Sequence, residues 1–114
     1  MKIMITGSRE TLDREYVFHL LDQEFPKDCV MINGMAKRGV DRFAFMWALV
    51  NKIPVLQRHA DWKKYPKVAG FIRNQVMVDE ADGCFAIWDG YSSGTEDAIK
   101  RAKAKGLEVE IHLL

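Results

Sequence analysis

The sequence has few cysteines and almost no net charge. Its two cysteines, Cys29 and Cys84, lie in apolar runs rather than in a Cys-x-x-Cys pair, so we expect buried thiols and no redox couple. Seventeen basic and sixteen acidic residues leave a net charge of +1, which is not the uniform positive field of a nucleic-acid-binding domain. A site for an anion must therefore be local.

Long apolar runs are also missing. The apolar runs of this sequence all fall far short of the ~20 residues that cross a bilayer. The strand-like run that starts at Lys2 leaves no room for a signal peptide. We therefore expect a cytoplasmic protein with no membrane partner. His19, His59 and His112 lack metal-ligand spacing, so we expect no metal, and no motif indicates another cofactor.

The residues that are present suffice for one compact domain over residues 1–114, with 48% hydrophobic side chains. Five runs of bulky residues predict strands at 2–6, 29–33, 54–57, 83–88 and 107–111, and apolar residues at spacings of three and four predict four helices between them. This alternation predicts an α/β fold: a three-layer α/β/α, Rossmann-like, doubly wound and mainly parallel sheet. Glu108 and Glu110 alternate with apolar residues, which predicts that the last strand lies at an edge.

Capping residues separate these segments. Thr11 is predicted to cap the first helix, and Ser93 with Glu96 has the spacing of a capping box at the start of the fourth. Gly106 after a basic turn predicts the end of that helix.

Ligands of such sheets bind beyond the carboxyl ends of the strands. After the first strand, Gly7 allows close approach, Ser8 offers a hydroxyl and Arg9 offers a bidentate donor for phosphate or carboxylate. This segment lacks the Walker and Gly-x-Gly-x-x-Gly patterns, which argues against ATP hydrolysis and ordinary NAD oxidoreduction. A tight turn with a solvated arginine is the alternative.

The segment after the second strand has two glycines, Gly34 and Gly39, around small and basic residues. The next helix is predicted to begin at about Gly39, so we expect free backbone N–H groups to face a bound anion. Asp41 either bonds a ligand hydroxyl or favours the helix dipole.

The segment after the fourth strand, from Asp89 to Thr95, combines small residues and hydroxyls at a helix N-terminus, as a phosphate cradle does. Glu96 and Asp97 follow in the same turn and would repel a phosphate unless their side chains point away.

The predicted third helix carries polar residues beside small ones. Gly70 aligns with Asn74, and Ala69 aligns with Arg73, so each polar side chain has space next to it. Trp62 precedes this helix and either stacks on a base or seals the loop against the core.

With these segments in order, nearly the whole chain resembles the SLOG superfamily, the Rossmann-like group of the Lonely Guy phosphoribohydrolases and the DNA-processing protein A domain. It looks closest to the small YspA-related branch of bacterial and phage proteins. The motifs that carry the resemblance are Gly7-Ser8-Arg9, Gly34-Met35-Ala36 with Gly39-Val40-Asp41, Asp61-Trp62 with Gly70 and Arg73-Asn74-x-x-Met77, and Gly94-Thr95.

The resemblance implies a nucleotide or nucleotide-derived, ADP-ribose-like ligand whose phosphate is held by the loops after the second and fourth strands. Arg73 falls where Lonely Guy enzymes carry an arginine, but Ala98 stands where their Pro-Gly-Gly-x-Gly-Thr-x-x-Glu loop has its glutamate. The candidate ligand-binding residues are Gly7, Ser8, Arg9, Gly34, Met35, Ala36, Gly39, Asp41, Trp62, Arg73, Asn74, Ser93, Gly94 and Thr95.

Three functions follow as hypotheses. The first is a sensor or sequestering protein for such a ligand, because the cradle is intact and the catalytic position is not. The second is a nucleotide N-glycosidase or phosphoribohydrolase with Arg73 and either Glu96 or Asp97 as catalytic residues, since a carboxylate stabilises positive charge on the ribose. The third, a single-stranded nucleic-acid-binding module, is disfavoured by the near-neutral charge. An exposed apolar helix face would suit a homodimer or a higher homo-oligomer.

Overall fold

The computed structural model describes residues 1–10 and 13–114. Within them, strands alternate with helices in the predicted order, which confirms the α/β class. The elements are β1 (Lys2–Gly7), α1 (Arg14–Glu24), β2 (Val30–Asn33), α2 (Val40–Val50), β3 (Val55–Gln57), α3 (Ala69–Glu80), β4 (Gly83–Trp88), α4 (Ser93–Lys105) and β5 (Glu108–Leu113).

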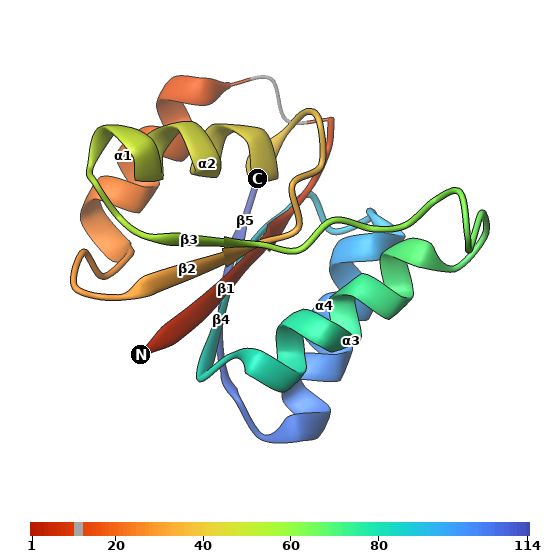
Figure 1. Cartoon of the computed structure of the whole chain (residues 1–114). Helices are drawn as coiled ribbons and strands as arrows, with labels where there is room; N and C mark the ends of the chain where they lie inside the picture. The colour runs from red at the N-terminus through yellow and green to blue at the C-terminus, as the bar shows by residue number, and fades with distance from the viewer. Residues whose placement is uncertain (11–12) are drawn as a thin grey trace.

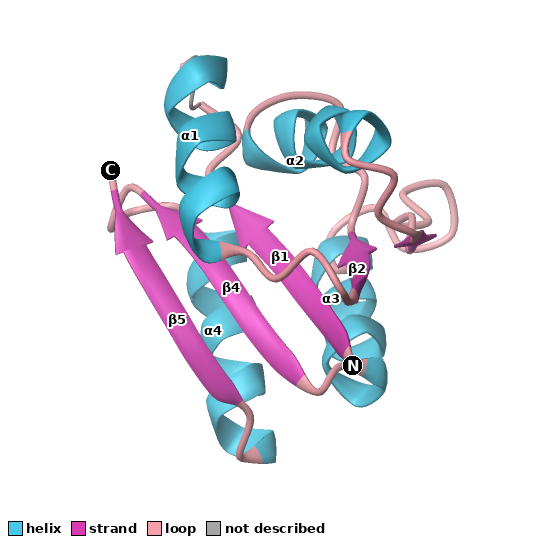
Figure 2. Ribbon diagram, turned by 90° about the vertical axis from the view of Figure 1, so that its left-hand side faces the viewer, coloured by secondary structure: helices cyan, strands magenta, loops and turns pink. Residues whose placement is uncertain are grey.

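The five strands form one parallel sheet in the order β3-β2-β1-β4-β5. Helices α1 and α2 cover one face, and α3 and α4 cover the other (Figures 1 and 2). This is the predicted three-layer, doubly wound arrangement, and β5 lies at an edge as its alternating sequence indicated. None of the helices in the described chain has the length and apolar character that a membrane crossing requires.

Two hydrophobic clusters hold the layers together. Side chains alternate across a strand, so Ile3 and Ile5 of β1 join the cluster under α1 and α2, whereas Met4 joins the cluster under α3 and α4. Both cysteines are buried and free, as predicted. Burial raises the pKa of the Cys84 thiol to about 12, so this thiol stays protonated.

The helix ends match the predictions in part. The predicted cap Thr11 lies outside the described residues, and the N-cap of α1 is Asp13, whose Oδ1 accepts a 2.9 Å hydrogen bond from the N–H of Tyr16. The predicted capping box is wrong: the N-cap of α4 is Ser92, and the Glu96 carboxylate pairs with Lys100 instead of reaching back. Gly106 does end α4, in the left-handed conformation with φ of +89°.

The strand order changes direction at β1. The chain proceeds outward from β1 to β2 and β3, then returns to β4 on the other side of β1. In open parallel sheets such a switch point leaves a crevice beyond the carboxyl ends of the two diverging strands. Here that crevice lies beyond β1 and β4.

Candidate functional site

A cavity of about 340 Å³ lies at this switch point. Its volume falls at the lower end of the ~300–1,000 Å³ range of small-molecule sites. Four segments far apart in the sequence form its wall. They are Thr6 and Gly7 at the end of β1 with Arg9 and Glu10 after it; Ala36 after β2 with Asp41 in the first turn of α2; Trp62 and Lys67 before α3 with Gly70, Phe71, Arg73, Asn74 and Met77 on it; and Ser92 to Thr95 at the start of α4.

Glycines let the first two segments approach each other. A β-carbon on Gly39 would lie 2.4 Å from the carbonyl oxygen of Ser8, and the residue has φ of +77°, a conformation that side chains disfavour. A β-carbon on Gly7 would lie 2.5 Å from the β-carbon of Val40. Only glycine therefore fits at these two positions, and α2 begins directly against the end of β1.

Ser8 lies beneath the cavity and does not line it. It is 1% exposed, and its hydroxyl oxygen accepts hydrogen bonds from the N–H of Asp89 at 3.0 Å and from the Ser92 hydroxyl at 3.2 Å. Its carbonyl oxygen accepts from the N–H of Val40. Ser8 thus ties together three of the segments around the cavity, and its hydroxyl is already engaged.

The loop after β2 is stabilised by its own side chains. The Oδ1 of buried Asn33 accepts from the N–H of Met35 at 2.8 Å, and the Oδ2 of Asp41 accepts from the N–H of Ala36 at 3.2 Å. The expectation that this loop offers free N–H groups to an anion is therefore wrong for Met35 and Ala36. The sequence could not show that Asn33, at the strand end, would take one of them.

Asp41 itself is a buried carboxylate on the cavity wall. It is 8% exposed, and burial raises its pKa above the ordinary value, while the Ala36 N–H, Arg73 and Arg9 oppose that shift. Its Oδ1 has no hydrogen-bond donor among residues 1–10 and 13–114. One oxygen of Asp41 therefore fixes the loop after β2, a role that neither sequence hypothesis named. Asp41 does lie in the first turn of α2, as the helix-dipole hypothesis requires, and its contact with a ligand hydroxyl stays a prediction.

Arg73 projects from α3 toward the loop after β2. Its Nη1 donates to the carbonyl oxygen of Gly34 at 2.6 Å, and its Nε donates to the Oδ1 of Asn74 at 3.2 Å. Gly34 leaves room for this guanidinium, because a β-carbon there would lie 2.6 Å from Nη1. Burial lowers the pKa of Arg73, Asp41 raises it and nearby Arg9 lowers it further, so two guanidinium groups face the same space.

The first turn of α4 opens onto the cavity. Within the part of the chain that the structure describes, the N–H groups of Ser93, Gly94 and Thr95 have no acceptor, and the N-cap side chain supplies none. A β-carbon on Gly94 would meet nothing within 4 Å, so this glycine is not needed for packing and leaves free volume next to the helix end.

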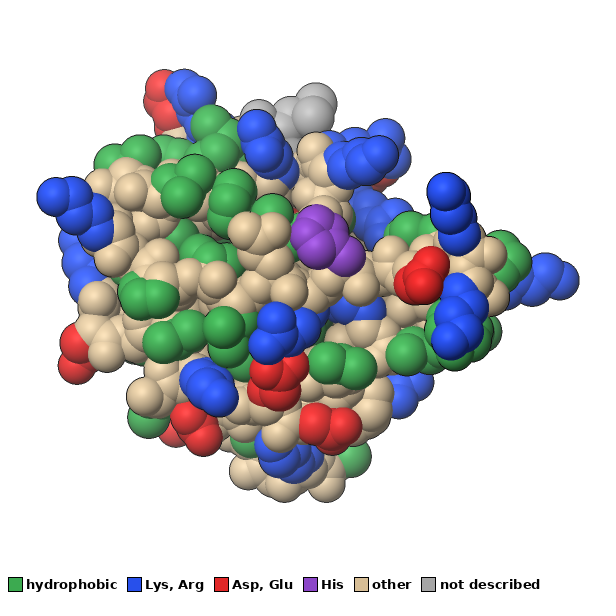
Figure 3. Space-filling view, viewed as in Figure 1, with side chains coloured by type: hydrophobic (Ala, Val, Ile, Leu, Met, Phe, Trp, Pro, Cys, Tyr) green, Lys and Arg blue, Asp and Glu red, His purple; other side chains and the backbone are tan. Residues whose placement is uncertain are grey.

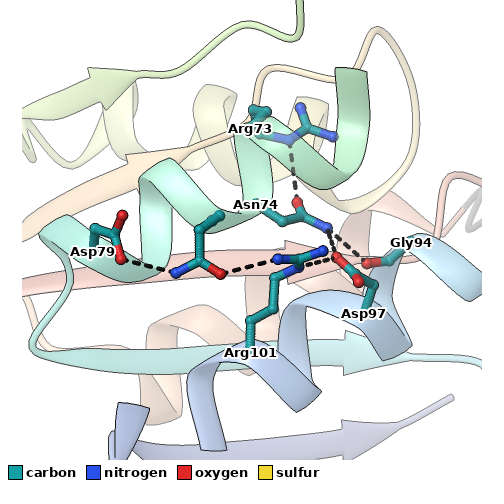
Figure 4. Close-up of polar contacts among 7 residues, drawn as sticks. Arg73, Asn74, Asp79, Gly94, Asp97 and Arg101 are labelled. Carbon is teal, nitrogen blue, oxygen red and sulfur yellow. Dashed lines mark hydrogen bonds and ion pairs between the residues drawn. The ribbon is translucent and has the colours of Figure 1, made fainter. Parts of the chain in front are cut away.

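The two carboxylates of this turn point elsewhere. Glu96 pairs with Lys100 at 3.2 Å on the surface. The Oδ2 of Asp97 accepts from Asn74 at 3.1 Å and from the Nε of Arg101 at 2.8 Å (Figure 4). Neither residue lines the cavity, and Ala98 is buried in the core under α3 and α4. The anticipated repulsion of a phosphate by these carboxylates is therefore largely removed.

Trp62 forms part of the rim. It is 48% exposed, its ring edge lies over Gly70, where a β-carbon would be 3.3 Å away, and the Arg9 guanidinium carbon lies 5.9 Å from the ring centroid. The ring is therefore fixed on α3 and partly open to a ligand.

The structure brings together ten of the fourteen predicted ligand-binding residues on the cavity wall: Gly7, Arg9, Ala36, Asp41, Trp62, Arg73, Asn74, Ser93, Gly94 and Thr95. Ser8 and Gly39 lie behind it, and Gly34 and Met35 line a second hollow beside it. Seven further lining residues were outside that predicted set: Thr6, Glu10, Lys67, Gly70, Phe71, Met77 and Ser92. Phe71 had a usable signal, since it lies on α3 beside Arg73, but Lys67 lies in an irregular loop without periodicity.

Comparison with known proteins agrees with this architecture. A model of the YspA, cpYpsA-related SLOG family matches residues 1–65, whereas no curated protein matches the chain. The matched part carries β1, β2, β3 and the cavity residues from Thr6 to Trp62. Because it covers more than half of the 114 residues, the chain belongs to the YspA, cpYpsA-related SLOG family, and this membership indicates a nucleotide-related small-molecule ligand in general.

Proposed function

We propose that this protein binds a nucleotide-derived ligand in the cavity and acts as a sensor or sequestering protein. The observation that carries the proposal is the first turn of α4, where three backbone N–H groups have no acceptor among the described residues. These groups and the free volume at Gly94 lie across the cavity from Arg73. N–H groups at a helix start bind phosphate by hydrogen bonding and by the helix dipole.

The neighbouring charges suit this role. Arg9 and Arg73 add positive charge, and two guanidinium groups that face one space repel each other until an anion lies between them. Arginine also binds phosphate bidentately. These charges support a phosphate position between α4 and the two arginines.

The remaining wall suits a sugar and a base. The Oδ1 of Asp41, which has no donor among the described residues, can accept a hydrogen bond from a sugar hydroxyl, and this bond would satisfy a buried acceptor. Trp62 and Phe71 offer aromatic surface on which a base can stack. Phosphate, hydroxyl and apolar subsites thus lie in one cavity.

Binding is favoured over hydrolysis by the placement of the carboxylates. Glycosidic bond cleavage needs a carboxylate near the ribose, and Glu96 and Asp97 lie outside the cavity with other partners. Hydrolysis would have to use Glu10 or Asp41. We therefore keep the phosphoribohydrolase as the alternative and make it an outcome of the test.

Isothermal titration calorimetry with adenosine and guanosine 5′-monophosphates, and with the two nucleosides as phosphate-free controls, tests the proposal. We expect saturable binding of at least one monophosphate, at least tenfold tighter than its nucleoside. The Gly94→Leu variant should fold normally, because its side chain enters open space, and should lose this binding. No binding at millimolar ligand, or unchanged binding by Gly94→Leu, would overturn the proposal.

Chromatography of the same mixtures after prolonged incubation tests the alternative. The binding role predicts that the nucleotide is recovered intact. Release of free base that disappears in Glu10→Gln or Asp41→Asn would replace it with the hydrolase.

We also propose that α3 mediates self-association. Val68, Ile72 and Val76 are exposed at a spacing of four residues along one side of this helix. Figure 3 shows hydrophobic side chains over α3, with charged side chains of both signs around them. An antiparallel twofold pairing would bury these apolar side chains of both copies and bring Lys64 and Lys67 of one copy toward Asp79 of the partner subunit.

Sedimentation velocity tests this association. We expect a dimer at micromolar concentration that Ile72→Glu converts to a monomer, whereas Val50→Glu, at an exposed apolar position on α2, leaves it intact. A parent protein that sediments as a monomer at all concentrations would refute it.

A further inference from the structure

A second hollow of about 470 Å³ adjoins the cavity. The two share Arg9, Ala36, Trp62 and Arg73 as lining residues. The second hollow adds the loop from Gly34 to Arg38, together with His59 and Ala60 beyond β3. The two spaces therefore border each other at Arg9 and Arg73.

The two hollows differ in charge. The cavity wall contains two carboxylates, Glu10 and Asp41. The described lining of the second hollow contains Lys37 and Arg38 in addition to the shared arginines, and no Asp or Glu. The second hollow is the more basic of the two, although the protein as a whole carries a net charge of only +1.

Part of this positive charge is already neutralised. Arg38 pairs with Glu10 at 2.7 Å, with both side chains largely exposed. Lys37, by contrast, has no carboxylate within ion-pair distance in the described part of the chain. Lys37, next to the shared Arg9 and Arg73, is therefore the cation available to an anionic group in this hollow.

We infer that the ligand extends through both hollows and carries a second phosphate group, which Lys37 binds beyond Arg9 and Arg73. This inference rests on the proposed function and specifies its ligand class: a nucleotide with two phosphate groups rather than a monophosphate. The two phosphates belong either on opposite sides of the ribose or in one diphosphate chain. The shared arginines lie between the two anionic positions in both arrangements.

Calorimetry with adenosine 5′-monophosphate, adenosine 3′,5′-bisphosphate and adenosine 5′-diphosphate distinguishes these arrangements. We expect one of the two diphosphorylated ligands to bind about tenfold tighter than the monophosphate, an advantage that shrinks with added salt because charge interactions are screened. Lys37→Glu should remove the advantage, so that the diphosphorylated ligand binds no tighter than the monophosphate. Lys103→Glu, at an exposed position in the last turn of α4, is the matched charge-reversal control and should preserve it.

The outcomes separate this inference from the function on which it rests. Monophosphate binding without any gain from a second phosphate overturns the inference and leaves the proposed function intact. A gain that survives Lys37→Glu places the second phosphate elsewhere and also overturns it. If none of the three nucleotides and neither guanosine ligand binds, the proposed function itself fails.

Discussion

Asn74 of α3 donates a 3.1 Å hydrogen bond to the carbonyl oxygen of Gly94 in the first turn of α4. Its amide oxygen accepts from Arg73 on the same helix, and its amide nitrogen also bonds Asp97. One side chain, only 3% exposed, therefore fixes the helix end and the arginine that face each other across the cavity.

Replacement of Asn74 by alanine should destabilise the protein by about 1–3 kcal/mol, because buried hydrogen-bonding groups lose their partner. Urea unfolding followed by circular dichroism measures this change. Gln75→Ala is the matched control on the same helix. Its hydrogen bonds to Asp79 and Arg101 lie nearer the surface, so its effect should stay within about 0.5 kcal/mol. Equal losses in the two variants would contradict the central position of Asn74.

Alanine at Gly39 should cost more than alanine at Gly106. Both glycines have positive φ, so each substitution adds backbone strain of about 1–3 kcal/mol. Only Gly39 adds a clash, with the β-carbon 2.4 Å from the carbonyl oxygen of Ser8, whereas Gly106 has open space around it. The midpoint temperature of thermal unfolding should be highest for the parent, lower for Gly106→Ala and lowest for Gly39→Ala. The reverse order of the two variants would show that the backbone at Ser8 moves to relieve the clash at little cost.

Asp89→Asn should destabilise the protein at neutral pH and not at low pH. The N–H groups of Ser92 and Tyr91 lower the pKa of Asp89 from 3.8 to about 2. A carboxylate with a depressed native pKa stabilises the fold above its unfolded pKa, and this contribution is lost as the pH falls from about 4 to about 2. The difference in unfolding free energy between parent and variant should shrink over this interval; a constant difference would exclude the titration of Asp89 as its cause.

Asp41→Asn should separate stability from binding. Burial raises the pKa of Asp41, so the charged form opposes folding as the pH rises above 3.8. The neutral amide can still accept from Ala36, and the variant should be at least as stable as the parent at pH 7, with a smaller gain at pH 3. Nucleotide binding should weaken about tenfold or more, because a hydrogen bond to a charged acceptor is lost. Unchanged affinity would exclude Asp41 from the ligand contacts.

Most of the fold could be predicted from local patterns. Strands such as 83–88 combine bulky apolar residues with flanking turn residues, and their predicted bounds match the structure at both ends. The parallel, doubly wound arrangement follows from the alternation of strands and helices, whereas the order of the inner strands was not predicted and comes from the structure. Helix starts were less predictable, because Ser92 and Ser93 are chemically identical candidates for the cap of α4 and only their position relative to Asp89 separates them.

The sequence predicted which loops and residue types form the candidate site, but not the hydrogen bonds between them. The residues of each loop were identified by type, yet no local pattern shows which hydrogen bonds are made inside the protein. Ser8 and Arg9 are neighbours in sequence, but the Ser8 hydroxyl is held by Asp89, 81 residues away, while Arg9 lines the cavity. Long-range contacts of this kind decide which polar groups remain for a ligand.

The parallel arrangement of all strand pairs also affects how the chain is synthesised and folds. The described strands form no local hairpin, and the central strand β1 meets its neighbour β4 only after most of the chain has been made: the N–H of Lys2 bonds the carboxylate of Asp82, 80 residues away. Until then one edge of an apolar strand stays unpaired on the nascent chain. Pairings this distant in sequence slow folding, so we expect refolding on the millisecond to second scale and a transient demand for chaperones during translation.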